Sequence, residues 1–137
     1  MSSIVVDASV TLAWCFADEQ TPMALKVLER LKAGDQVLVP SFWSLEVLNT
    51  LLVGEKRGRI SPDQTKAFLR DLAALTPSFD YASAELVNGP IQKLCRDHGL
   101  TPYDVLYVEL AMRAKCPLAT QDQAQKIVAN ALNIECL

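Results

Sequence analysis

The sequence predicts an α/β protein, a three-layer α/β/α sandwich around a central, mainly parallel sheet of four to five strands. Two observations favour this fold class. Short β-branched and aliphatic runs alternate along the chain with longer segments in which apolar residues recur at helical spacing. The runs at 3–7 and 36–40 are almost continuously apolar, which is typical of strands buried on both faces. Strands that alternate with helices in this way build a sheet covered on both sides.

Caps and apolar spacing predict the helices of the first half. Residues 10–16 and 23–33 follow helical patterns, and Gly34 suits the left-handed position that ends the second helix. Residues 43–55 carry apolar side chains at 45, 48, 51 and 52, which we interpret as a core-facing stripe. Ser61-Pro62-Asp63-Gln64 combines a serine cap, proline at the first helical position and glutamine at the third, so it predicts another helix start.

The second half continues the alternation. Phe79-Asp80-Tyr81 is a candidate strand, and residues 82–98 form a helix that Asn88-Gly89-Pro90 breaks or kinks. Thr101-Pro102-Tyr103-Asp104 is a second cap, proline and acid combination, and it predicts a helix to about residue 115. The expected remainder is a strand at 117–120, a helix at 121–132 and a last strand at 134–137.

Length and composition predict one domain over residues 1–137. A chain of 137 residues can bury roughly two thirds of the surface that its unfolded form exposes. Half of the residues are hydrophobic and 21% are charged, close to the globular average, so no segment is expected to be disordered. We find no repeat, linker or low-complexity segment that would divide the chain.

The cysteines, the apolar runs and the net charge limit the cellular compartments and binding partners that we expect for this chain. The four cysteines show no C-x-x-C spacing and no signal-peptide pattern opens the chain, so we expect a reducing cytoplasm. The apolar runs fall well short of the roughly 20 residues of a membrane span, so no membrane partner is expected. With a net charge of −3, nucleic-acid binding would depend on metal ions or on local basic residues such as Lys56-Arg57-Gly58-Arg59.

Four acidic residues from distant positions form the candidate site. Asp7 and Asp122 directly follow predicted strands, where parallel sheets collect functional groups. Asp104 lies in the first turn of one helix and Glu46 in the middle of another. Helix capping would explain each aspartate singly, but it does not explain Glu46, whose structural alternative is a solvated helix face. By the same reasoning Ser9 and Thr120 are candidate caps, with Asp122 at the second helical position.

An acidic cluster of this kind predicts a bound cation. Neighbouring carboxylates raise one another's pKa, so a cluster that stays ionised needs a compensating positive charge. Carboxylate oxygens are the ligands that Mg²⁺ and Mn²⁺ prefer. Zinc prefers histidine and cysteine ligands, and this chain has one histidine and widely spaced cysteines, so zinc is not expected. Such an ion activates water and stabilises charge on a phosphate, which predicts phosphodiester hydrolysis.

The order of these motifs resembles that of PIN-domain nucleases over essentially the whole chain. The resemblance rests on Val5-Val6-Asp7-Ala8-Ser9, on Glu46 with Asn49, on Pro102-Tyr103-Asp104 and on Leu118-Ala119-Thr120-Gln121-Asp122. It is closest to the VapC-like toxins of toxin-antitoxin modules. It implies an endoribonuclease that forms a homodimer, binds an antitoxin protein and uses Mg²⁺ or Mn²⁺. In that family the acids matching Asp7, Glu46, Asp104 and Asp122 bind metal and support cleavage of RNA, and Ser9, Asn49 and Thr120 would be supporting polar groups.

Of three other functions, two would each leave a recognisable pattern in the sequence. A magnesium-dependent phosphotransfer or phosphatase domain also places acids at the strand ends of a parallel sheet. A phosphoryl-accepting receiver, which is similar in size, should have a pair of acids after the first strand and a late lysine, and this chain shows neither pattern. An inactive PIN fold that serves only for binding should have lost one or more acids, and all four positions are acidic. A PIN nuclease with a non-toxin role in RNA processing would share the same fold and site, so the sequence leaves it open.

Overall fold

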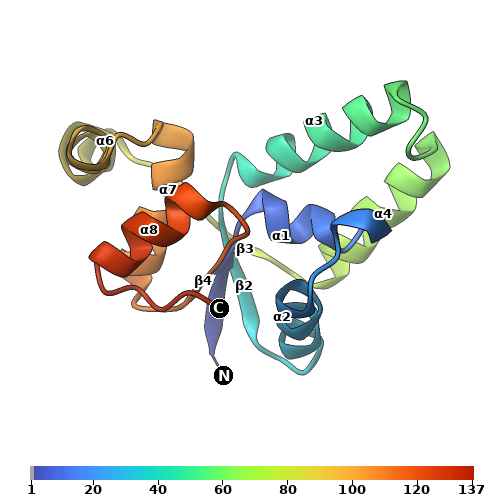
Figure 1. The fold of residues 1–137 in the computed structure, drawn as a ribbon, viewed down its shortest axis with the longest axis horizontal. Helices are drawn as coiled ribbons and strands as arrows, with labels where there is room; N and C mark the ends of the chain where they lie inside the picture. The colour runs from blue at the N-terminus through green and yellow to red at the C-terminus, as the bar shows by residue number, and fades with distance from the viewer. Residues whose placement is uncertain (1) are drawn as a thin grey trace.

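The computed structural model describes residues 2–137 and contains a four-stranded, all-parallel sheet between two layers of helices (Figure 1). Its strands lie in the order β3, β2, β1, β4, with bounds Ser78–Asp80, Gln36–Pro40, Ser3–Val6 and Leu118–Ala119. The predicted sandwich is therefore confirmed. The expected strand at 134–137 reduces to a single parallel bridge between Leu118 and Cys136, so the sheet has four strands.

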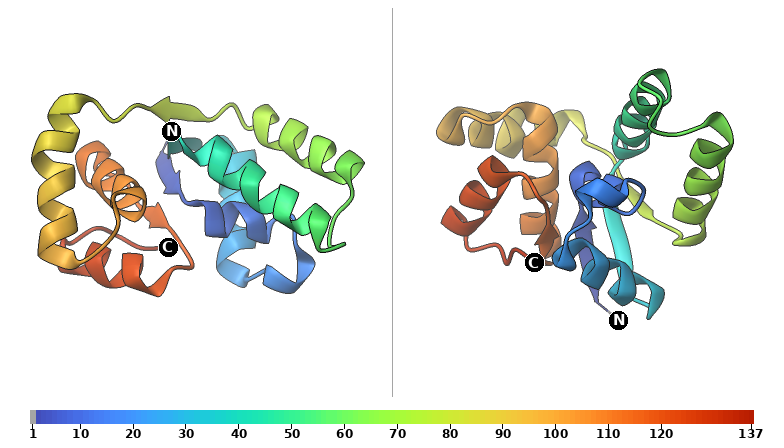
Figure 2. Two further views of the ribbon diagram at one scale, coloured as in Figure 1. Left: turned by 90° about the horizontal axis from the view of Figure 1, so that it is seen from above. Right: turned by 45° about the vertical axis from the view of Figure 1, so that its right-hand side comes forward.

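The first half of the chain covers one face of the sheet and the second half covers the other (Figures 1 and 2). The helices of the first layer are α1 (Ala8–Ala13), α2 (Pro22–Lys32), α3 (Trp43–Lys56) and α4 (Pro62–Ala74). Those of the second are α5 (Ala84–Leu86), α6 (Gln92–His98), α7 (Pro102–Ala114) and α8 (Gln123–Ala131). A short turn, η1 (Ala17–Glu19), follows α1, and η2 (Val87–Ile91) joins α5 to α6. Within residues 2–137 no helix is both long enough and apolar enough to pass through a bilayer.

Several helix ends form where the sequence places them. Ser61 accepts the N–H of Gln64 while the Gln64 side chain accepts the N–H of Ser61, the predicted capping box. Thr101 caps α7, and the chain departs from helical geometry at Gly89, as the break at Asn88-Gly89-Pro90 predicts. Gly34 has a φ of +118°, which only glycine adopts easily, and it follows the end of α2.

Two predicted caps are wrong by two residues. Asp7, not Ser9, caps α1 by accepting the N–H of Val10. Asp122, not Thr120, caps α8, so Asp122 stands before the helix and not at its second position. The reason is that the helix starts differ from those predicted: α1 begins at Ala8, so Ser9 is already inside it, and α8 begins at Gln123, so Asp122 is the residue before it.

The buried face of α3 also differs from the predicted stripe at 45, 48, 51 and 52. The buried residues are Trp43, Val47, Leu51 and Gly54, whereas Leu45 is 71% exposed. This helix carries apolar residues on more than one side, so their spacing alone does not determine which side is buried. Close packing selects it, because a Cβ at Gly54 would lie 3.1 Å from the ring of Phe16.

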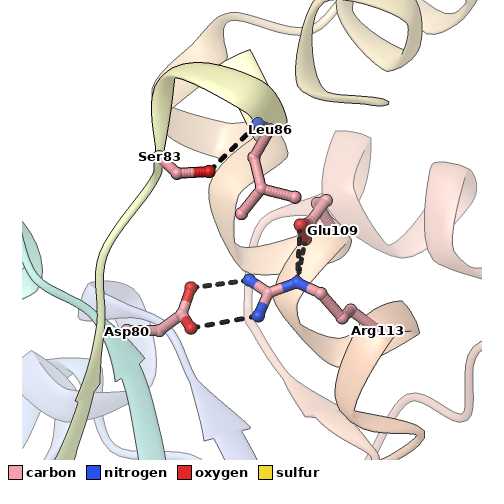
Figure 3. Close-up of polar contacts among 5 residues, drawn as sticks. All are labelled: Asp80, Ser83, Leu86, Glu109 and Arg113. Carbon is pink, nitrogen blue, oxygen red and sulfur yellow. Dashed lines mark hydrogen bonds and ion pairs between the residues drawn. The ribbon is translucent and has the colours of Figure 1, made fainter. Parts of the chain in front are cut away.

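Arg113 ties the edge strand β3 to α7 (Figure 3). Its guanidinium donates to both oxygens of Asp80 at 3.0 and 2.6 Å, and its Nε donates to Glu109 one turn earlier at 2.9 Å. Glu109 is buried, and Arg113 is its ion-pair partner. Nearby, Ser83 caps α5 by accepting the N–H of Leu86. This network fixes α7, which carries Asp104, against the end of the sheet.

Candidate active site

Asp7 lies at the carboxyl end of β1, and its neighbours come from β4. Because Val6 pairs with Ala119, the next residues on the two strands, Asp7 and Thr120, stand side by side. Thr120 donates its hydroxyl to Oδ2 of Asp7, and Ser9 donates its hydroxyl to Oδ1. The parallel register therefore places two buried polar groups together from positions 113 residues apart.

Burial dominates the electrostatics of Asp7, whose exposed fraction is 3%. Loss of solvation raises the pKa of this carboxyl, and the hydrogen bonds from Ser9, Thr120 and Val10 lower it in part. The negative charge of Asp122 raises the pKa further, so Asp122 lies close enough to act on Asp7.

Glu46 projects from α3 and is bound by Tyr107 from α7. The phenol of Tyr107 donates to Oε1 of Glu46 at 2.6 Å. Burial raises the pKa of the half-buried Glu46, the bond from Tyr107 lowers it, and the charges of Asp7 and Asp104 raise it. Burial and the same bond raise the pKa of Tyr107, so the phenol keeps its proton and remains a donor. Glu46 therefore lies within the electrostatic field of two other acids.

Asp104 and Asp122 are connected through Gln125. The backbone N–H of Gln125 donates to Oδ1 of Asp122 at 3.1 Å, and its side-chain Nε2 donates to Oδ1 of Asp104 at 3.3 Å. Asp104 itself lies in the first turn of α7, where its N–H donates to the hydroxyl of Thr101. The fold thus brings all four predicted acids to one end of the sheet. Their roles in metal binding and catalysis stay predictions.

The three predicted supporting residues differ in their placement. Ser9 and Thr120 contact Asp7 directly, and each also accepts a backbone N–H from the loop before α8, Ser9 from Gln121 and Thr120 from Asp122. Asn49 is exposed one turn after Glu46, and no hydrogen bond within residues 2–137 joins it to the acids. The structure therefore groups Ser9 and Thr120 with the acids but not Asn49.

The basic segment 56–59 is partly occupied by internal contacts. Arg59 pairs with Asp18 at 2.7 Å and with Glu19 at 3.2 Å, and its guanidinium lies 4.2 Å from the ring centroid of Phe16. Lys56 and Arg57 are exposed at the end of α3. Arg59 is also exposed, so its ion pairs and not burial distinguish it from Lys56 and Arg57.

Sequence reasoning missed two residues of the site, Tyr107 and Gln125. Tyr107 follows Asp104 by three residues, a spacing that places both on one side of a helix. Gln125 precedes the buried Val128 and Ala129 by three and four residues, so it is a polar residue on an apolar helix face. A polar residue on an otherwise apolar helix face is the sequence signal that could have identified Gln125.

The donor set fits a hard divalent cation. Within residues 2–137 no lysine, arginine or histidine forms an ion pair with Asp7, Glu46, Asp104 or Asp122, so their charge is not neutralised by basic side chains. In the same part of the chain no three acidic, histidine or cysteine side chains are arranged to hold one ion together. The site therefore fits an ion such as Mg²⁺ that binds through one or two carboxylates and keeps several waters.

A parallel α/β/α sandwich with acids gathered beyond the carboxyl ends of its strands is typical of enzymes that act on phosphates with a bound cation. The PIN domain profile matches residues 4–131. The chain therefore belongs to the PIN-domain family, which is a family of nucleases. A search of curated proteins gave no match.

Solved structures share the fold at low sequence identity. The structure of PAE2754 from Pyrobaculum aerophilum has a TM-score of 0.72 and 18% identity, over 98% of this chain and 83% of that one. VapBC2 from Rickettsia felis, bound to a DNA fragment from its promoter, has a TM-score of 0.64 and 16% identity, over 98% and 97%. A domain of a protein of unknown function from Methanocaldococcus jannaschii has a TM-score of 0.54 and 18% identity, over 100% and 90%.

Proposed function

We propose that this PIN nuclease is a Mg²⁺- or Mn²⁺-dependent endoribonuclease and the toxin of a VapBC-type toxin-antitoxin module. The observation that carries the proposal is the gathering of four acids at one end of the sheet, where Ser9 and Thr120 bind Asp7 and Gln125 links Asp104 to Asp122. Asp122 raises the pKa of Asp7, and Asp7 and Asp104 raise that of Glu46. Because no basic side chain in residues 2–137 compensates for this charge, a divalent cation is the natural counterion.

Each residue has a distinct task in the proposed reaction. Asp7, Glu46, Asp104 and Asp122 would surround the ion, one or two of them binding it directly and the others through its waters. The ion would supply an activated water and would stabilise charge on the phosphate. Ser9 and Thr120 fix the carboxylate of Asp7. Tyr107 occupies Oε1 of Glu46 and leaves Oε2 to accept a proton from the attacking water. The raised pKa of Glu46 suits a base that works closer to neutral pH.

RNA cleavage with and without divalent metal tests the nuclease. We expect the purified chain to cut RNA with Mg²⁺ or Mn²⁺ and to stop on addition of a chelator. Asp7→Asn should abolish cleavage and keep the fold, because the neutral side chain removes a buried charge. Asp63→Asn, a matched change at an exposed acid on α4, should cleave normally. Full activity of Asp7→Asn, or activity in chelator, would contradict the assigned site.

The toxin assignment is supported by the similarity to VapBC2 and by a hollow on the early helices that is lined by both apolar and polar side chains. A hollow of about 910 Å³ lies between α2 and α4. Its apolar lining includes Trp14, Leu28, Leu31 and Phe68, and its charged lining includes Lys32, Asp35 and Asp71. None of the four acids lines it. An antitoxin that inserts apolar side chains here and extends a basic or polar group to the acids would block metal or RNA.

Mixing experiments test the antitoxin. The protein encoded beside this chain should inhibit RNA cleavage when the two are combined. Leu28→Glu, in the hollow, should cleave RNA but escape inhibition, because it places a charge at the apolar contact. Leu25→Glu is the control, since Leu25 is exposed on the same helix and does not line the hollow. Unchanged cleavage by the wild type on mixing would favour the non-toxin role in RNA processing.

The proposal includes two further expectations. A VapC-like toxin acts on RNA in the cytoplasm, where the scattered thiols of this chain would stay reduced. We also propose a homodimer, in line with the family resemblance. Analytical ultracentrifugation of the chain alone should give the mass of two chains, and a single-chain mass at micromolar concentration would argue against the dimer.

A further inference from the structure

Gln125 contacts two acids of the site from one position. As the third helical residue of α8 it donates its backbone N–H to Asp122, the N-cap, at 3.1 Å. Its side-chain Nε2 reaches across to α7 and donates to Oδ1 of Asp104 at 3.3 Å. The two acids come from different helices and lie 18 residues apart in sequence, and Gln125 is the residue that hydrogen-bonds both.

The side chain of Gln125 is buried with one polar atom, Oε1, that lacks a hydrogen-bond partner among the described residues. The exposed fraction of Gln125 is 2%. A buried acceptor without a donor destabilises a fold, and an apolar side chain beside Val128 and Ala129 would avoid that cost. Turning the amide over would set Oε1 against the carboxylate of Asp104, so the present orientation is the favourable one. Packing therefore does not explain a glutamine here, whereas its bond to Asp104 does.

We propose that Gln125 is a positioning residue that holds the Asp104 carboxylate relative to Asp122 and thereby raises the affinity of the site for its divalent cation. The inference rests on the proposed function. Gln125 does not itself bind the ion, because its donor faces Asp104 and its Oε1 is enclosed. Residues that orient metal-binding carboxylates typically change metal affinity about 10- to 100-fold when they are replaced. The length of the bond, 3.3 Å, places the expected effect near the lower end.

Binding of Mn²⁺ measured by electron paramagnetic resonance tests the proposal without an activity assay. Gln125→Leu should bind Mn²⁺ about tenfold more weakly than the wild type. Its resistance to urea should be equal or greater, because the unpaired Oε1 is removed. Gln123→Leu, the same change at an exposed position of α8, should bind Mn²⁺ like the wild type.

A second variant and a double variant make the result decisive. Gln125→Asn keeps the amide but is one methylene too short to reach Asp104, so it should lose affinity as Gln125→Leu does. In an Asp104→Ala background no carboxylate remains to be positioned, and adding Gln125→Leu should change Mn²⁺ affinity less than about twofold. Wild-type affinity in both Gln125 variants would overturn this inference alone. If the wild type binds no Mn²⁺, both the inference and the proposed metal-dependent nuclease fail.

Discussion

Replacing Arg113 by methionine should destabilise the protein strongly, although Arg113 lies near the surface. The change removes four hydrogen bonds, two to Asp80 and two to Glu109 (Figure 3). It also leaves the carboxylate of Glu109, whose side chain is 3% exposed, without its ion-pair partner. Methionine preserves most of the aliphatic packing, so the effect reports on charge more than on volume.

The magnitude follows from the burial of each partner. Removing one member of a buried ion pair costs about 3–5 kcal/mol, because the remaining charge stays desolvated. The Arg113 side chain is 40% exposed, so water can reach Glu109 in the variant, and we expect about 2–3 kcal/mol in total. Loss of the ion pair with Asp80, whose side chain is 25% exposed, contributes at most about 1 kcal/mol of this. For a chain of 137 residues the decrease in Tm would be roughly 6–12 °C.

Urea unfolding followed by circular dichroism measures the effect, with the double variant Glu109→Met, Arg113→Met as the control. The double variant removes the buried Glu109 charge together with its partner and leaves only the partly exposed Asp80 without its ion pair, so its free energy of unfolding should lie within about 1 kcal/mol of the wild type. A double variant as unstable as Arg113→Met, or a single variant within about 0.5 kcal/mol of the wild type, would refute the reasoning from the buried Glu109 charge.

Three further predictions concern the site and a helix end. Tyr107→Phe removes the hydrogen bond that lowers the pKa of Glu46, so the acidic limb of the pH profile of RNA cleavage should move to higher pH; an unmoved limb would exclude Glu46 as the titrating base. Burial raises the pKa of Asp7 in the folded chain, so its stabilising contribution is complete below the ordinary carboxyl pKa and is lost as the pH rises through the raised value. In chelator, urea unfolding should therefore show Asp7→Asn gaining stability over the wild type as the pH increases, and a constant difference would contradict the raised pKa. Ser61→Ala removes one half of the capping box and should lower the free energy of unfolding by about 1 kcal/mol, whereas no change in urea denaturation would show that Gln64 suffices.

Local physical chemistry explains which elements could be predicted. The caps at Ser61 and Thr101 and the break at Gly89-Pro90 depend on residues within one or two turns, so their sequence is enough to specify them. The buried strands were identifiable because both faces must be apolar in a covered parallel sheet. The same rule indicated where side chains at strand ends would gather, which is why Asp7 and Asp122 could be proposed as site residues.

Contacts between distant segments decided what the sequence left open. The face of α3 depended on Phe16 packing at Gly54, since apolar residues at Leu45 and Leu52 offered an equally good stripe by spacing. The sequence predicts Thr120 either as a helix cap or as a supporting polar group, and the pairing of β1 with β4 decides this by turning its hydroxyl toward Asp7.

For the four acids, too, some properties follow from the sequence and others from the tertiary structure. Their identity, their order and the preference for an oxygen-binding cation came from the sequence, because these depend on residue chemistry alone. The tertiary structure alone provides the hydrogen bond from Tyr107 to Glu46 and the connection that Gln125 makes between Asp104 and Asp122. The physical reason is that electrostatic and hydrogen-bond interactions fall off over a few ångströms, and only the packed fold brings these side chains within that range.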